Sequence, residues 1–361
     1  MSAGEDGKIK LWELPKGELK KDITDSVLTL QMLRRVGVAK FSEACRNLVM
    51  AVSAMPELVL WDLNRESKAR DFSSLMHTQA QDAAWNAMSS GIYVIYKDGK
   101  FINFDPRDPT PSMIAEGTAH IGIRHRRILD LPDYNRVATF GGGKHGQREC
   151  SIWDPRSFSQ PLKTVEFDTS SGAMLPMYEE GSGVIYCGGK GDGHIRFIEL
   201  CDDDRIVAAT GCYDTTDPER GLCLVPRRLL NVMSVEVSRM LKLSTESLRT
   251  LHWRTPRTRS DLFQDDIFGP SRDTSAALME VVDWEDKQDD MFPTLRIQPE
   301  GTKKASEVVV EKKVTKRVGG PLHEEKEDLR TKKITIDEIV AMAPQISTES
   351  SSSDEEDSES W

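Results

Sequence analysis

Short apolar segments that close on an aromatic residue recur along much of the chain. They are Lys8–Trp12, Leu58–Asp62, Lys100–Asp105, Cys150–Asp154 and His194–Ile198. The closing aromatic residues stand at positions 12, 61, 104, 153 and 197, so the successive steps are 49, 43, 49 and 44. Short apolar runs between turn residues are typical of β-strands. The pattern predicts a strand-based unit repeated at a nearly constant interval.

Turn residues support the strand prediction. Asp6-Gly7, Asp98-Gly99 and Asp192-Gly193 each precede one of the apolar segments, and such pairs provide the positive φ angles of a two-residue hairpin. The run Leu58–Leu63 is apolar at nearly every position, which fits a sheet covered on both faces. A period in the forties that closes on Trp-Asp or a variant is typical of a four-stranded WD-type propeller blade. We therefore predict an all-β, WD-repeat β-propeller, and the five matches disfavour the alternative of a β-sandwich.

Composition narrows the class of protein. The 361 residues are 38% hydrophobic and 30% charged, and no apolar run approaches the roughly 20 residues that a membrane-spanning helix needs. The start Met1–Asp6 has no basic or apolar region of a secretory signal. Six cysteines lie far apart with no C-x-x-C pair, which favours reduced thiols. We expect a cytoplasmic protein without a transmembrane segment.

The composition changes at about residue 298. From there to residue 361 the only aromatic residue is Trp361, and Lys, Glu and Ser dominate, so we expect a disordered tail. Within it, Thr335–Glu338 forms a capping-box pattern that precedes a short amphipathic helix with an apolar face. The chain then ends in an acidic run. The tail residues that we expect to bind a partner are Ile336, Ile339, Val340, Asp354, Glu355, Glu356, Asp357, Glu359 and Trp361.

Motifs for catalysis and cofactors are missing from the sequence. The glycine-rich runs 141–146 and 188–193 do not match G-x-x-x-x-G-K-[ST] or a G-x-G-x-x-G that opens a helix. No H-E-x-x-H, no histidine pair with two cysteines at zinc spacing and no G-x-S-x-G occurs. His77 and His120 are expected to form hydrogen bonds within their own blades. We predict no enzyme activity, no cofactor and no metal site, and a net charge of −11 disfavours nucleic-acid binding.

Several longer motifs resemble the coronin family. The run Gly188–Glu199 is similar to the last regular coronin blade, and Thr255–Asp266 is close to the Pro-Arg-x-x-Ser-Asp-Leu-Phe-Gln-Asp-Asp run of the coronin C-terminal extension. Phe167–Gly172 and Val235–Leu243 are similar to other coronin segments. The resemblance covers residues 4 to about 297. The acidic end with a terminal Trp, and no sustained heptads after residue 298, resemble the long, tandem or pod-type branch.

The resemblance also carries expectations about organisation. In coronins the blade that closes at the position of Trp12 is the second, so we expect an incomplete ring of about five blades from a seven-bladed parent, truncated at its N-terminus. The expected domains are propeller blades at 1–225, the last blade and coronin-type extension at 226–297, and the tail at 298–361.

A coronin-like function follows from the same resemblance. It implies a cytoskeleton-associated scaffold or regulator that binds actin filaments, the actin-branching Arp complex, or both. Arg124, Arg126 and Arg127 could form a basic patch for such a partner, although a solvated face is the commoner role of three nearby arginines. The alternative is a membrane-traffic adaptor at the Golgi or vesicle periphery that binds vesicle-traffic proteins.

Overall fold

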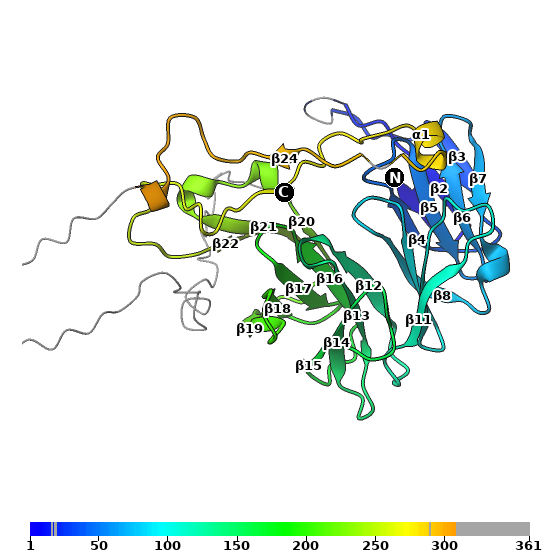
Figure 1. Cartoon of the computed structure of the whole chain (residues 1–361), viewed down its shortest axis with the longest axis horizontal. Helices are drawn as coiled ribbons and strands as arrows, with labels where there is room; N and C mark the ends of the chain where they lie inside the picture. The colour runs from blue at the N-terminus through cyan, green and yellow to red at the C-terminus, as the bar shows by residue number, and fades with distance from the viewer. Residues whose placement is uncertain (16, 18–19, 289, 308–361) are drawn as a thin grey trace, which may run out of the picture.

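The computed structural model describes residues 1–15, 17, 20–288 and 290–307 (Figure 1). The regular secondary structure of the described residues is almost entirely β-strand, and none of their helices is long and apolar enough to cross a membrane.

Six antiparallel sheets follow one another along the chain, each with its strands paired in sequence order. The first holds β1 (Ser2–Ala3), β2 (Lys8–Leu11) and β3 (Leu28–Gln31); the second holds β4 (Val36–Phe41), β5 (Leu48–Ser53), β6 (Leu58–Asp62) and β7 (Ser67–Asp71). The third holds β8 (Ala80–Trp85), β9 (Ile92–Tyr96), β10 (Lys100–Phe104) and β11 (Met113–Thr118). The fourth holds β12 (Arg127–Leu131), β13 (Arg136–Gly142), β14 (Arg148–Trp153) and β15 (Lys163–Glu166). The fifth holds β16 (Met174–Glu179), β17 (Val184–Gly189), β18 (His194–Leu200) and β19 (Val207–Asp214), and the sixth holds β20 (Gly221–Leu224), β21 (Glu236–Leu243) and β22 (Leu248–Arg254). Short 3-10 turns connect some strands: η1 (Ser73–Leu75), η2 (Pro132–Tyr134), η3 (Arg227–Leu229) and η4 (Val232–Ser234).

The sheets are arranged as propeller blades. The first strands of neighbouring sheets contact one another, β4 with β8, β8 with β12, β12 with β16 and β16 with β20, so they form the inner wall. Figure 1 shows the sheets following an arc, with β1–β7 at one end and β20–β22 at the other. The first and sixth sheets each have three strands and do not pair with each other within the described residues. The predicted all-β WD-type propeller with an incomplete ring is confirmed.

The repeated aromatic segments occupy equivalent places in the blades. They form β2, β6, β10, β14 and β18, each the strand before the outermost one of its sheet. The sixth sheet was not recognised from the repeat. Its Trp253 lies in β22 and stands further from Phe197 along the sequence than any two successive closing aromatic residues stand from each other. The connection between β20 and β21 is lengthened by η3 and η4, and this breaks the spacing.

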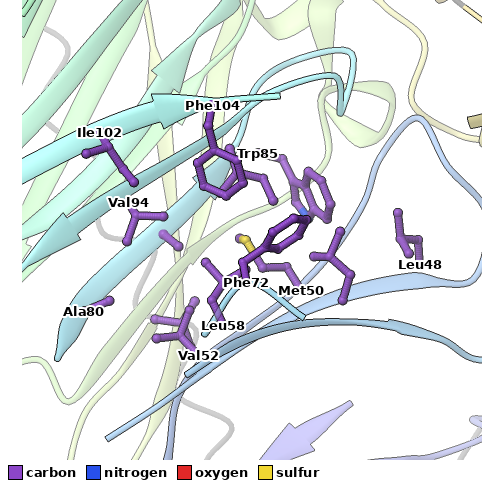
Figure 2. Close-up of a cluster of buried hydrophobic side chains, with 14 of the residues drawn as sticks. Leu48, Met50, Val52, Leu58, Phe72, Ala80, Trp85, Val94, Ile102 and Phe104 are labelled. Carbon is purple, nitrogen blue, oxygen red and sulfur yellow. The ribbon is translucent and has the colours of Figure 1, made fainter. Parts of the chain in front are cut away.

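The core consists of apolar layers between successive sheets. The largest layer joins the second and third sheets, and Figure 2 shows Leu48, Met50 and Leu58 facing Trp85 and Phe104. Every residue of β5 and β6 is buried, as the apolar pattern on both faces predicted. Fully burying one such Leu or Phe side chain contributes about 1.5–3 kcal/mol. The sheets therefore depend on their neighbours for stability.

A C-terminal extension crosses the blades on one face. Its middle part, which we call the strap (residues 271–288 and 290–295), contains β23 (Ser271–Arg272), α1 (Val281–Glu285) and β24 (Thr294–Leu295), and β23 pairs with β24. Figure 1 shows it running from the sixth sheet back to the second. Trp284 of α1 is fully buried in the layer between the second and third sheets, and its Nε1 donates to the Ser89 carbonyl at 2.7 Å.

One arginine of the strap connects three blades. Arg272 donates through Nε and Nη2 to the Glu180 carboxylate, both at 2.8 Å, and through Nη1 to the Ala87 carbonyl at 2.7 Å. Its Nη2 also donates to Glu43 at 3.2 Å. Glu43, Ala87 and Glu180 lie in the loops that follow the inner strands β4, β8 and β16. The strap therefore joins separate sheets at the ends of their inner strands.

The described chain continues past residue 297. The Phe263 amide donates to the Lys303 carbonyl at 3.0 Å, and the Ala305 amide of η5 (Ala305–Glu307) donates to the Phe263 carbonyl at 2.8 Å. Ser306 Oγ donates to Asp265 at 2.6 Å. Residues 303–306 thus pack on the Asp261–Asp266 motif, whereas the sequence placed the start of the tail at 298. The domain division stays a prediction, and the partner-binding residues predicted in the tail lie outside the described residues.

Candidate functional site

A hollow of about 260 Å³ opens where three inner strands begin. Its lining comes from the starts of β4, β8 and β12 and the end of β5. The lining residues are Arg35, Val36, Gly37, Ser53, Ala54, Gln79, Ala80, Gln81, His125 and Arg127. The strap binds the loops at the other ends of β4 and β8. The hollow therefore lies on the face away from the strap, and we call it the basic hollow.

Of the three arginines in the predicted basic patch, two are occupied by the backbone. Arg126 is 3% exposed, and it donates through Nη1 to the Lys97 carbonyl at 2.9 Å and through Nη2 to the His120 carbonyl at 2.6 Å. Arg124 donates to the carbonyls of Gly146, Thr169 and Ser170. The three residues do not form one exposed patch, because these two guanidiniums fasten loops. Carbonyl oxygens carry no net charge, so both guanidiniums still contribute positive potential to this face.

Arg127 is the member of that cluster that lines the hollow, together with Arg35. Arg127 is half-buried, whereas the Arg35 side chain is 56% exposed and lies 3.6 Å from Glu5. An exposed pair of this kind contributes little, typically about 0–1 kcal/mol, so Arg35 can exchange Glu5 for a carboxylate of a partner. Arg34 is exposed beside it. The site therefore gathers arginines from the second and fourth sheets.

Arg35 was not predicted from the sequence as a site residue, but its position in the repeat could have identified it. Arg35 and Arg127 stand at the same spacing before the closing aromatic residues of their blades, Trp61 and Trp153. Each arginine therefore lies just before or at the start of the inner strand of its blade. Inner strands converge on the propeller axis, so equivalent positions in different blades come close together.

His125 completes the polar lining. It is open to solvent, yet partial removal of its water by the surrounding loops, followed by the positive charge of Arg127, lowers the pKa of its imidazole. A histidine with a lowered pKa is neutral at pH 7. The charge of the hollow at neutral pH therefore comes from the arginines.

Exposed apolar side chains lie in the loops that lead into the lining of the basic hollow. Ile121 is 82% exposed and Ile123 is 100% exposed in the loop before β12, and Leu33 is 75% exposed in the loop before β4. Large apolar residues in contact with water near positive charges are typical of protein-binding surfaces. This combination suits an acidic protein surface with apolar groups of its own.

The histidines that the sequence assigned to blade hydrogen bonds have that role. In the fourth sheet, His120 Nε2 is hydrogen-bonded to Thr139 Oγ1 at 2.9 Å, and Trp153 Nε1 donates to the same hydroxyl at 2.8 Å. His120 Nδ1 lies 2.9 Å from Glu149. His77 Nε2 lies 2.8 Å from Asp98 in the third sheet. These networks fix the loops that carry the basic hollow.

A second network of charges fixes the neighbouring loops. Arg148 binds Asp168 through Nε and Nη2, both at 2.7 Å, and Arg196 Nε donates to the same carboxylate at 2.9 Å. Burial opposes ionisation of Asp168, but the hydrogen bonds from Arg148 and Arg196 lower its pKa to about 2. The run Phe167–Gly172, recognised in the sequence, therefore has a structural role between the fourth and fifth sheets.

Known proteins resemble the chain in sequence and in fold. No family model matches it. It is 31% identical over 299 residues to the coronin-like protein crn1 of Schizosaccharomyces pombe (81% of this chain, 49% of the relative) and 32% identical over 267 residues to coronin-A of Dictyostelium discoideum (74% and 59%). Coronin-2A of Homo sapiens is 29% identical over 286 residues (77% and 53%). The chain thus spans about half the length of these relatives.

A solved structure gives the same fold. The WD40 domain of Toxoplasma gondii coronin matches with a TM-score of 0.75 and 22% identity, over 82% of this chain and 76% of that one.

Proposed function

The chain belongs to the coronin family, and from this premise we propose that it is a non-enzymatic scaffold that attaches to actin filaments through the basic hollow. The observation that carries the proposal is the convergence of Arg35 and Arg127 at the start of the inner strands. The chain as a whole has a net charge of −11, so the positive charge of these arginines is confined to the basic hollow and its surroundings. The hollow would dock an acidic patch of the filament.

The charges and the apolar rim have different roles in this proposal. Arginines lead to faster association with an acidic surface, an effect that weakens as salt rises. Ile121 and Ile123 would be buried against the filament and would slow dissociation. Binding should therefore fall with ionic strength but retain a part that salt does not remove.

Cosedimentation of the full chain with actin filaments tests the proposal. The double variant Arg35→Glu/Arg127→Glu should bind at least tenfold more weakly, because it places negative charges where an acidic patch of the filament would dock. A tenfold loss of affinity corresponds to about 1.4 kcal/mol. The matched control is Arg156→Glu/Arg205→Glu, which makes the same charge change at side chains that are 80% and 61% exposed, in hairpins of the fourth and fifth sheets. Equal binding by the two double variants would refute the role of the hollow.

We propose a separate role for the tail in binding the actin-branching Arp complex. Its support is the sequence pattern of an amphipathic helix followed by acidic residues and Trp361. A large aromatic side chain is a frequent binding hot spot, and truncation typically costs about 2 kcal/mol or more. A peptide of residues 330–361 should bind the complex, and Trp361→Ala should speed its dissociation. Recovery of vesicle-coat components instead would favour the adaptor alternative.

A further inference from the structure

Three side chains that can ligate a metal meet on the fifth sheet. His194 Nδ1 lies 2.7 Å from Asp214 Oδ1, and Cys212 Sγ lies 2.9 Å from the same oxygen. One ligand atom from each residue lies within 4.8 Å of the others. The cluster is remote from the basic hollow, which is built on the second to fourth sheets.

Strand register brings the three residues together. His194 is the Cα partner of Asp214, and Arg196 is the partner of Cys212, across the antiparallel pair β18 and β19. Residues two apart on a strand point to the same face, so all four side chains share one face. This arrangement could not be predicted from the sequence, because His194 and Cys212 lie on different strands and are not neighbours along the chain.

The cluster is accessible to a small cation. The side chains of His194 and Asp214 are 50% and 69% exposed, and Cys212 is half-buried beneath them. The backbone under the cluster is held by the pairing of β18 with β19, and Arg196, on the same face, donates to Asp168 at 2.9 Å. A cation can therefore enter from solvent, and little movement of the backbone is needed.

We propose that His194, Cys212 and Asp214 form a zinc-binding site. Imidazole nitrogen, thiolate sulfur and carboxylate oxygen are the three ligand types that zinc prefers, and a water molecule would complete the tetrahedron. Zinc bonds of about 2.0–2.3 Å place neighbouring ligand atoms roughly 3.4–3.6 Å apart, so the two contacts to Asp214 lengthen by less than about 1 Å. Rotation of the side chains provides that change.

Zinc would take the place of the hydrogen-bonded contacts that His194 and Cys212 make with Asp214. Burial, followed by the hydrogen bond to Asp214, raises the pKa of the Cys212 thiol to about 12, and Arg196 and Asp168 act on it in opposite directions. The sulfur therefore enters the complex by releasing its proton to solvent. His194 would bind through Nδ1, and Asp214 through a carboxylate oxygen.

The test is zinc titration of the full, metal-free chain against a chromophoric chelator, with cobalt(II) as a spectroscopic probe. Zinc should bind to one site per chain that has a sulfur ligand. The cobalt complex should therefore show a thiolate-to-metal charge-transfer band. Cys212→Ser and His194→Asn should each weaken binding at least tenfold, and Cys212→Ser should abolish the band. The matched controls are Cys223→Ser and His145→Asn, which change exposed residues outside this cluster and should leave both readouts unchanged.

Two outcomes would overturn the proposal. One is zinc affinity that is equal in the wild type and in the folded double variant His194→Asn/Cys212→Ser, which would place binding elsewhere, for example on the acidic tail. The other is a cobalt complex without a sulfur band. Near-ultraviolet circular dichroism of each variant establishes that it is folded.

Discussion

Removing the Trp284 side chain should destabilise the propeller although this residue lies far from it in sequence. Trp284 belongs to the strap, is fully buried, and packs edge-to-face on Trp85 with ring centroids 6.4 Å apart. Truncating a buried Trp to Ala typically costs about 3–5 kcal/mol. Because the ring fills the layer between the second and third sheets, the loss falls on the blades as well as on the strap.

A hydrogen bond adds to this cost. Trp284 Nε1 donates to the carbonyl of Ser89, a residue that is fully buried and held at a φ of 54°. Losing the indole leaves that carbonyl without this donor, and an unsatisfied buried group costs about 1–3 kcal/mol. Trp284→Phe retains most of the packing but not the donor, so it should lose about 1–3 kcal/mol. Trp284→Ala should lose about 4–8 kcal/mol from both effects.

Urea unfolding followed by circular dichroism measures both losses. The control is Val282→Ala in the same helix, where the side chain is 53% exposed, and the change should stay within about 0.5 kcal/mol. A Trp284→Ala midpoint equal to that of Val282→Ala would refute the claim that the strap stabilises the blades.

Two further predictions concern the networks that fix the loops. The pKa of Asp168 is lowered from 3.8 to about 2, so its ionised form contributes about 2 kcal/mol of stability above pH 4 that is lost as the pH falls towards 2; Asp168→Asn should flatten the dependence of the urea midpoint on pH in this range, and an unchanged dependence would contradict the assignment. Thr139→Val should cost about 2 kcal/mol or more because His120 and Trp153 both lose their shared hydroxyl partner. Thr139→Ser retains that hydroxyl and should unfold at a higher urea concentration than Thr139→Val; equal midpoints would argue against the network.

The blades were predictable because their pattern is local. An aromatic residue in the strand before the outermost one, a preceding Asp-Gly turn and a nearly constant spacing are all readable along the chain. The repeat missed the sixth sheet because η3 and η4 lengthen one connection and move Trp253 out of step; only the resemblance of Val235–Leu243 to a coronin segment pointed to a last blade there. A repeat based on spacing fails where an insertion changes the spacing but leaves the pairing of the strands unchanged.

The sites were harder to predict because they depend on how distant segments meet. Arg126 looks like a surface charge in the sequence, but its guanidinium turns inward to backbone carbonyls that the sequence does not identify. Arg35 and Arg127 come together only when the inner strands converge. His194 and Cys212 meet only through the register of β18 with β19.

Amide hydrogen exchange on the full chain, alone and bound to actin filaments, tests the central claim most directly. If the basic hollow is the docking surface, filaments should slow exchange at residues 33–37, 79–81 and 119–127, which form and surround it. The loop at residues 42–47, which contacts the strap at the other end of β4, should exchange as it does in the free chain. Slowed exchange confined to the strap and its loops, with none at the hollow, would contradict the account.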